Sequence, residues 1–151
     1  PQGSSMGMKS MPSPAHRRRA GVVAVITRED RFLVIRRSHL VRAPRAICFP
    51  GGGIEAGETE AEALVRELQE ELAAQARAVH RLWQSQSASG LSLAWWRAEL
   101  DENSPLQANP AEVESIHWWT ADELNRHPAL LPTNRDFLGA WNRREILWDL
   151  P

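Results

Sequence analysis

Three glutamates with helical spacing are the residues of this sequence best suited to chemistry. Glu67, Glu70 and Glu71 stand at positions i, i+3 and i+4, so a helix would place their carboxylates on one face. Carboxylates held together repel one another, and an oxygen-seeking divalent cation such as Mg²⁺ removes that repulsion. A solvated acidic face is the alternative interpretation, and the triplet alone favours it.

The residues that precede the triplet favour a metal site instead. The run Gly51–Gly53 lets the backbone come close to a ligand or an ion, because glycine has no side chain. Five residues separate Gly52 from Glu58, and seven more separate Glu58 from Arg66, which directly precedes Glu67. A pattern with this many fixed positions is specific, so we interpret the acidic face as a cation site.

The pattern resembles the signature of the Nudix hydrolase family, G-x5-E-x7-R-E-U-x-E-E-x-G-U, in which U is a bulky aliphatic residue. The match runs from Gly52 through Glu71 and departs at the end, where Ala73 and Ala74 replace the family's glycine and aliphatic residue. Ala73 either adopts the left-handed conformation that glycine prefers, at about 1 kcal/mol, or lets the helix continue. Neither outcome affects a carboxylate.

This resemblance implies a Mg²⁺-dependent pyrophosphohydrolase, with Mn²⁺ as an alternative metal, that cleaves a nucleoside diphosphate linked to another group. The groups that it assigns to the metal are Glu67, Glu70, Glu71 and the carbonyl group of Gly51, with Glu58 near the metal or holding the loop. Arg66 would brace the carboxylates through an ion pair, and Gly52 would lie against the substrate. A metal in such a site neutralises the pyrophosphate and lowers the pKa of an attacking water.

Two features outside the signature resemble the MutT-like group of the family, which hydrolyses oxidised nucleotides. Arg37 stands at the same distance before Phe49–Gly52 as the arginine that contacts phosphate in that group. Asn134 closes a Pro-x-Asn segment similar to the one whose asparagine contacts a purine edge in that group. From the residues alone, Arg37 could equally be a strand-end cation in water, and Asn134 could be the N-cap of a helix.

A further carboxylate is expected from the segment before the strand that contains Trp118. This segment resembles the loop that supplies a glutamate, six residues before a tryptophan, in MutT-like enzymes. Glu112 fits that spacing and would activate or orient the attacking water, with Glu114 in reserve. A surface acid is the alternative for either residue.

The resemblance favours a (d)NTP or an oxidised purine nucleotide as substrate, converted to a nucleoside monophosphate and pyrophosphate. A nucleotide sugar, ADP-ribose or a coenzyme A type substrate is the alternative, as is a Nudix module that senses a nucleotide without cleaving it. Diadenosine polyphosphate hydrolases carry a tyrosine downstream of the signature, and this chain contains no tyrosine. The intact acidic triplet disfavours a sensor, which has no need of clustered carboxylates.

The hydrophobic pattern predicts strands and helices in alternation. The predicted strands are 22–27 and 32–35, joined as a hairpin by the polar segment 28–31, and then 47–49, 78–86, 91–100 and 113–119. Capping boxes at Thr59/Glu62 and Thr120/Glu123 predict the starts of two helices, and 134–144 is the last helix.

The order of these elements predicts an α/β fold with a mixed β-sheet between helices, and the resemblance implies the α/β/α sandwich of the Nudix type. In the first helix, Leu64, Leu68 and Leu72 recur at i, i+4 and i+8, with Ala61 and Val65 beside them, so we expect one buried stripe. The carboxylate face lies next to this stripe. In the last helix the residues expected to face inward are Phe137, Leu138 and Trp141.

Length and composition set the remaining expectations. The 151 residues suit one domain, predicted over 20–151 after a disordered tail, 1–19, that includes a remnant of an expression vector. A net charge of −1 gives no general attraction to nucleic acid or lipid, and Arg17–Arg19 is interpreted as a solvated lead-in to the first strand. We therefore expect a nucleotide substrate as partner, without nucleic acid or membrane, and a monomer or homodimer.

Cysteine usage and apolar runs bear on the compartment. The one cysteine, Cys48, excludes an internal disulfide framework, so a reducing, cytoplasmic compartment is expected. A small buried residue next to Phe49 is favoured over a nucleophile for Cys48. No run of about 18 apolar residues is present, so no membrane-spanning segment is expected.

Overall fold

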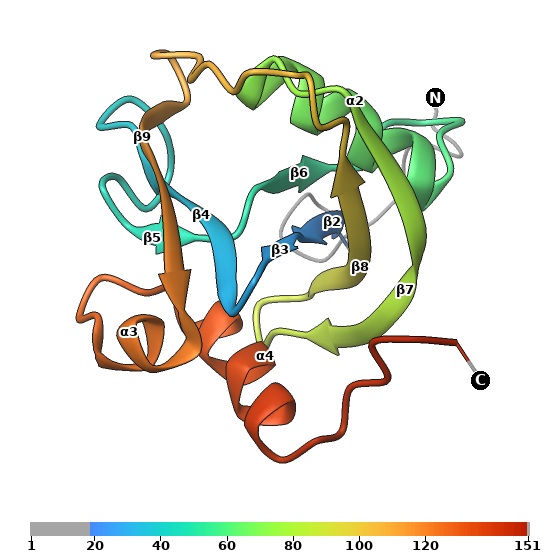
Figure 1. The fold of residues 1–151 in the computed structure, drawn as a ribbon, viewed down its shortest axis with the longest axis vertical. Coiled ribbons are helices and arrows are strands. Elements are labelled where there is room, and N and C mark those ends of the chain that lie inside the picture. The colour runs from blue at the N-terminus through green and yellow to red at the C-terminus, as the bar shows by residue number, and fades with distance from the viewer. Residues whose placement is uncertain (1–18, 151) are drawn as a thin grey trace, which may run out of the picture.

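Two four-stranded sheets, with helices on either side, form the molecule over residues 19–150, which the computed structural model describes (Figure 1). In the first sheet β2 (Arg19–Val25) pairs antiparallel with β6 (Gly51–Gly53) and parallel with β8 (Leu91–Leu100). The strand β7 (Ala76–Gln86) pairs antiparallel with β8 at the edge. This sheet is therefore mixed, as predicted.

The second sheet is antiparallel and is built around β4 (Arg31–Arg37). One edge of β4 pairs with β9 (Val113–Thr120), and the other edge pairs with β3 (Thr27–Arg28) and then with β5 (Ile47–Cys48). The predicted hairpin is confirmed with a tighter turn, because Arg28 pairs with Arg31 and only two residues remain between them.

Helices cover opposite sides of this framework. The helix α2 (Glu60–Leu72) lies on one side, and α3 (Ala121–Arg126) and α4 (Pro132–Asn142) lie on the other (Figure 1). Figure 1 also shows the loop before β9 passing next to the C-terminal end of α2. The predicted arrangement of a mixed sheet between helices is confirmed.

Two hydrophobic clusters fix the helices. Leu64, Leu68 and Leu72 are completely buried under α2, as predicted, whereas Val65 is 39% exposed, so its assignment to the stripe is wrong. Val65 follows Leu64 directly, and the 100° step between neighbours carries it away from the sheet. On the opposite side the rings of Trp95 and Phe137 stack at 4.7 Å between centroids and anchor α4.

Both predicted capping boxes are present. The hydroxyl group of Thr59 accepts a hydrogen bond from the backbone of Glu62, and the Glu62 carboxylate accepts one from the backbone of Thr59. Thr120 and Glu123 exchange the same pair of bonds at the start of α3. Because these bonds are local, α2 must begin at a fixed distance from β6.

Two local predictions are wrong. The last helix begins at Pro132, whose fixed φ suits a first turn, and its N-cap is Leu131, so Asn134 is not the N-cap. The list of predicted strands was also incomplete, because Gly51–Gly53 forms a further strand, β6, which pairs with Gly21–Val23 of β2.

The predicted tail stays a prediction over residues 1–18, which include Arg17, Arg18 and the predicted vector remnant and lie outside the described residues. Arg19 was predicted to belong to the tail, but it lies in β2. Over residues 19–150, no helix has both the length and the apolar composition needed to cross a membrane.

We expect Ala73→Gly to stabilise the protein. Ala73 ends α2 with φ 53° and ψ 28°, the left-handed conformation, which costs an L-residue about 1–2 kcal/mol. Glycine removes this cost but loses about 0.5–1 kcal/mol through its greater freedom when unfolded, so a net gain of about 0.5–1 kcal/mol is expected in urea denaturation.

The matched control is Ala74→Gly. Ala74 is 1% exposed and has no positive φ, so glycine there removes a buried methyl group and relieves no strain. The free energy of unfolding should fall. Equal changes at the two positions would contradict the assignment of strain to Ala73.

Candidate active site

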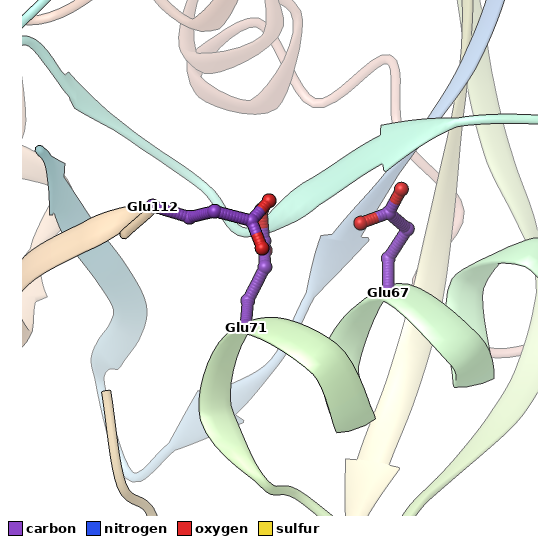
Figure 2. A group of neighbouring side chains, drawn as sticks. All are labelled: Glu67, Glu71 and Glu112. Carbon is purple, nitrogen blue, oxygen red and sulfur yellow. The ribbon is translucent and has the colours of Figure 1, made fainter. Parts of the chain in front are cut away.

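Three carboxylates from two distant segments meet beside β6. One oxygen each of Glu67, Glu71 and Glu112 lies within 4.8 Å of the others. Figure 2 shows Glu67 and Glu71 rising from one face of α2, and Glu112 reaching across from the loop before β9. The helix spacing predicted the first two, and the structure brings Glu112 to them. We call these three residues the acidic cluster.

The acidic cluster is electrostatically strained in the absence of a cation. Glu71 is 7% exposed, and burial together with the neighbouring charge of Glu67 raises the pKa of its carboxyl to about 8. Burial also raises the pKa of Glu67, although the Arg66 guanidinium opposes that shift. A backbone N–H, from Gly51, donates to Glu71 at 3.2 Å. Buried oxygen donors that repel one another in this way fit a divalent cation.

Two glycines of β6 allow close approaches beside the acidic cluster. A Cβ atom on Gly52 would lie 2.2 Å from the carboxylate carbon of Glu67, and one on Gly51 would lie 2.1 Å from the carbonyl oxygen of Val22. The predicted close approach is therefore an approach to the Glu67 side chain on one side and to the β2 backbone on the other.

Arg66 forms hydrogen bonds or ion pairs with the other acidic residues predicted for the site. Its guanidinium donates two hydrogen bonds to Glu58, at 2.6 and 2.8 Å, and one to the carbonyl oxygen of Gly53 at 2.9 Å. It also contacts Glu70 at 3.2 Å and Glu67 at 3.3 Å. These bonds hold the pKa of the Glu58 carboxyl well below its ordinary value. Glu58 and Glu70 thus lie on Arg66, beside the acidic cluster rather than in it.

A β-bulge separates the two candidate glutamates of the loop before β9. Arg36 of β4 pairs with Ser115 and Arg37 pairs with Val113, which leaves Glu114 without an opposite residue. Glu114 turns to Arg45 at 3.3 Å and to Arg36 at 3.9 Å, while Glu112 joins the acidic cluster. The geometry therefore favours Glu112 over Glu114 for a role at the site.

A cavity of about 330 Å³ opens next to the glycine strand. Arg37, Gly52 and Asn134, the three residues assigned to the substrate, all line it. Arg37 donates from Nε to the carbonyl oxygen of Arg42 at 2.7 Å. Asn134 is 3% exposed; its Oδ1 accepts from the backbone N–H of Phe49 at 2.8 Å, and its Nδ2 donates to the Thr133 hydroxyl group at 3.1 Å.

Cys48 also lines this cavity but is only 4% exposed. Burial raises the pKa of its thiol to about 11, so the reactive thiolate is disfavoured. The prediction of a small buried residue at this position is confirmed.

Two residues that support Glu112 were not identified from the sequence. Ser38, which is 2% exposed, donates from its backbone to the carbonyl oxygen of Glu112 at 3.0 Å and contacts Ala111 through its hydroxyl group at 3.2 Å. Asn109 contacts both α2 and the Glu112 carboxylate. No local spacing marks contacts between segments so far apart in the chain.

Comparison with known proteins gives a consistent result. The model of the NUDIX domain family matches residues 15–140. Phosphatase NudJ of Escherichia coli K12 is 27% identical over 107 residues, which cover 68% of this chain and 69% of NudJ.

Solved structures are similar over most of their length. The E. coli ORF135 protein superposes with a TM-score of 0.69 and 25% identity, over 89% of this chain and 96% of its own. The MutT protein of Methanosarcina mazei Go1 gives a TM-score of 0.70 at 19% identity, over 84% and 94% of the two chains. The second likeness is one of fold.

The metal-free protein should lose stability as the pH rises through the titration of Glu71. Its folded pKa is about 8, whereas an unfolded glutamate titrates near ~4.3, so between these values the native state binds more protons than the unfolded state. The free energy of unfolding therefore falls with rising pH. Urea titrations in EDTA across this range should show a smaller fall for Glu71→Gln, which cannot titrate.

Glu62→Gln on the same helix is the control. Glutamine can still complete the capping box, so the pH dependence should match that of the wild type. Parallel pH profiles for Glu71→Gln and the wild type would show that the buried carboxylate is not the source.

Proposed function

This chain belongs to the Nudix family and is a hydrolase of phosphoric anhydride bonds, and from that premise we propose that it is a Mg²⁺-dependent pyrophosphohydrolase of nucleoside triphosphates. Water adds to one phosphorus of the α–β anhydride bond, and the bridging oxygen leaves with the other phosphoryl group. The products are a nucleoside monophosphate and pyrophosphate.

The observation that carries this proposal is the acidic cluster at the edge of the substrate cavity. Gly52 lines the cavity on one side and lies against the Glu67 carboxylate on the other, so a polyphosphate in the cavity would reach the acidic cluster. Polyphosphate and carboxylates repel one another, and a shared divalent cation is the usual way to bring them together.

We propose that Glu67 and Glu71 hold the cation, with Glu70 and the Gly51 carbonyl group as further ligands. A bound divalent cation supplies charge neutralisation for the pyrophosphate and acidifies water. Arg66 keeps Glu58 and Glu70 beside the acidic cluster and offsets part of its negative charge. Mn²⁺ suits the same oxygen donors.

A base for the attacking water is also proposed within the acidic cluster. Glu112 comes from a separate loop, so its carboxylate can face the water while the α2 carboxylates face the cation. It would accept the water proton as the new phosphorus–oxygen bond forms.

The cavity residues suit a nucleotide. Arg37 lines the cavity, and its positive charge also acts on Glu71, so its guanidinium can donate to phosphate oxygens near the acidic cluster. The Asn134 amide keeps one N–H beyond its bond to Thr133, and this N–H can donate to an acceptor on a base. A purine, oxidised or not, is the base that we propose.

An assay for pyrophosphate release also distinguishes two alternative functions, hydrolysis of another nucleotide-containing substrate and nucleotide sensing without hydrolysis. A nucleotide sugar, ADP-ribose or a coenzyme A type substrate would release no pyrophosphate but would still require the acidic cluster. A sensing module would bind nucleotides tightly and release no product after long incubation with Mg²⁺ or Mn²⁺. A panel of normal and oxidised dNTPs, sugar nucleotides and coenzyme A therefore separates these alternatives.

Glu71→Gln and Glu67→Gln should each lower Mg²⁺-dependent pyrophosphate release by about 100-fold or more. Residues that merely orient metal ligands commonly contribute 10- to 100-fold, and these two carboxylates are proposed as ligands. Glu62→Gln on the same helix should retain wild-type turnover. Normal turnover in both cluster variants would refute the metal assignment.

Arg37→Ala should raise KM for a nucleoside triphosphate about 10-fold, with a smaller change in kcat. A charge-assisted hydrogen bond to a ligand contributes about 1.5–3 kcal/mol, and 1.4 kcal/mol corresponds to a factor of ten. The control is Arg42→Ala, because Arg42 contacts Arg37 through its backbone carbonyl, which the substitution keeps. If both variants raise KM equally, Arg37 has no specific contact with the substrate.

A further inference from the structure

The loop that carries Glu112 is fixed by one asparagine whose polar groups are all engaged. We infer that Asn109 is the positioning residue that sets the Glu112 carboxylate against the C-terminal end of α2, an inference that rests on the proposed role of Glu112. Three sets of contacts support this inference: those of the Asn109 backbone, those of its side-chain amide, and the hydrogen bond from Ser38 to the backbone of Glu112.

The backbone of Asn109 ties the loop to the helix. Its N–H donates to the carbonyl oxygen of Glu71 at 2.8 Å, and its carbonyl oxygen accepts from Glu112 at 2.9 Å and from Val113 at 2.8 Å. The last carbonyl groups of a helix have no partner within the helix, so α2 offers this acceptor by default. The loop is thereby registered on the residue that contributes a carboxylate to the acidic cluster.

The side-chain amide acts at both of its ends. Nδ2 donates to the carbonyl oxygen of Glu70 and to Oε2 of Glu112, each at 3.3 Å. Oδ1 accepts from the backbone N–H of Ala111 at 3.1 Å and closes the turn that leads to Glu112. Only an amide of this length supplies both the acceptor for the turn and the donor for the carboxylate.

Ser38 fixes the backbone of Glu112 but not its side chain, so the position of the carboxylate depends on Asn109. Ser38 holds the backbone carbonyl of Glu112 from the β4 side. The Glu112 carboxylate faces Glu67 and Glu71, and like charges drive it toward solvent. The Nδ2–H of Asn109 opposes this movement, so it keeps the carboxylate at the cluster before any cation or substrate binds.

A donor exchange tests this contact without measuring activity. Asn109→Asp keeps the acceptor for Ala111 but has no donor, so the metal-free variant should unfold at a lower urea concentration than the wild type. Combined with Glu112→Gln, the aspartate can accept from the new amide. At least half of the loss in urea midpoint caused by Asn109→Asp should then disappear.

Two further variants exclude simpler causes. Asn103→Asp adds the same charge to an exposed position in the same loop and should leave the midpoint unchanged. Asn109→Ser adds no charge and keeps a short acceptor, but it has no amide, so its midpoint should fall in the wild-type background. Equal losses for Asn109→Asp with Glu112 and with Gln at position 112 would overturn the inference.

Turnover then tests whether the contact serves the site. Asn109→Asp and Asn109→Ser should each lower kcat about 10-fold with KM within about two-fold, the usual range for a residue that orients a functional group. In the Glu112→Gln background the same changes should alter kcat less than about two-fold. A purely structural role would lower turnover equally in both backgrounds and would overturn the inference.

The two experiments distinguish the two proposals. If Glu112→Gln alone leaves kcat unchanged, the proposed role of Glu112 is wrong. The inferred role of Asn109 in the site then fails as well. The urea midpoints of the double variants would still show whether Asn109 and Glu112 are in contact. If Glu112→Gln abolishes turnover but the urea midpoints are additive, Glu112 is functional and Asn109 does not position it.

Discussion

The repulsion between Glu67 and Glu71 is the constraint on which the rest of the site depends. One helical turn apart and largely buried, these carboxylates have raised pKa values, so water alone does not compensate them. Neighbouring groups offset part of this negative charge: Arg66 forms an ion pair with Glu67, and the Gly51 N–H donates a hydrogen bond to Glu71. A protein that did not bind a cation here would gain by replacing either glutamate with an amide.

The hydrophobic core keeps these carboxylates in place. Leu68 and Leu72 flank Glu71 along α2, and their complete burial fixes the rotation of the helix about its axis. With that rotation fixed, Glu71 must lie at the edge of the leucine stripe, where the sheet covers much of its side chain. Each buried leucine contributes roughly 1.5–3 kcal/mol, enough to hold a strained carboxylate that local electrostatics would expel. The capping box at Thr59 then fixes where along the axis the helix begins.

The sequence predicted what depends on local spacing. The capping box predicted the start of α2, and the period of 3.6 residues predicted its buried leucines and the pairing of Glu67 with Glu71. Contacts across the chain were not predicted, because nothing within a few residues of Asn109 indicates that it meets α2. Asn134 was expected to contact a purine edge or to cap the last helix; it lines the cavity, and the cap is excluded because its Oδ1 accepts from Phe49, 85 residues away. Only the folded chain shows such partners.

The short segment from Phe49 to Gly53 joins the two halves of the site. At one end the N–H of Phe49 holds the Asn134 amide, which faces the cavity; at the other, Gly51 donates to Glu71 and Gly52 lies against Glu67. Because β6 pairs with β2 in a fixed register, a shift of this segment would move both ends together. The distance between the group that would contact a base and the carboxylates that would bind a cation is therefore set by one stretch of backbone. A side chain at Gly51 would collide with the β2 backbone, and one at Gly52 would displace the Glu67 carboxylate, which explains why the glycines, and not only the glutamates, belong to the site.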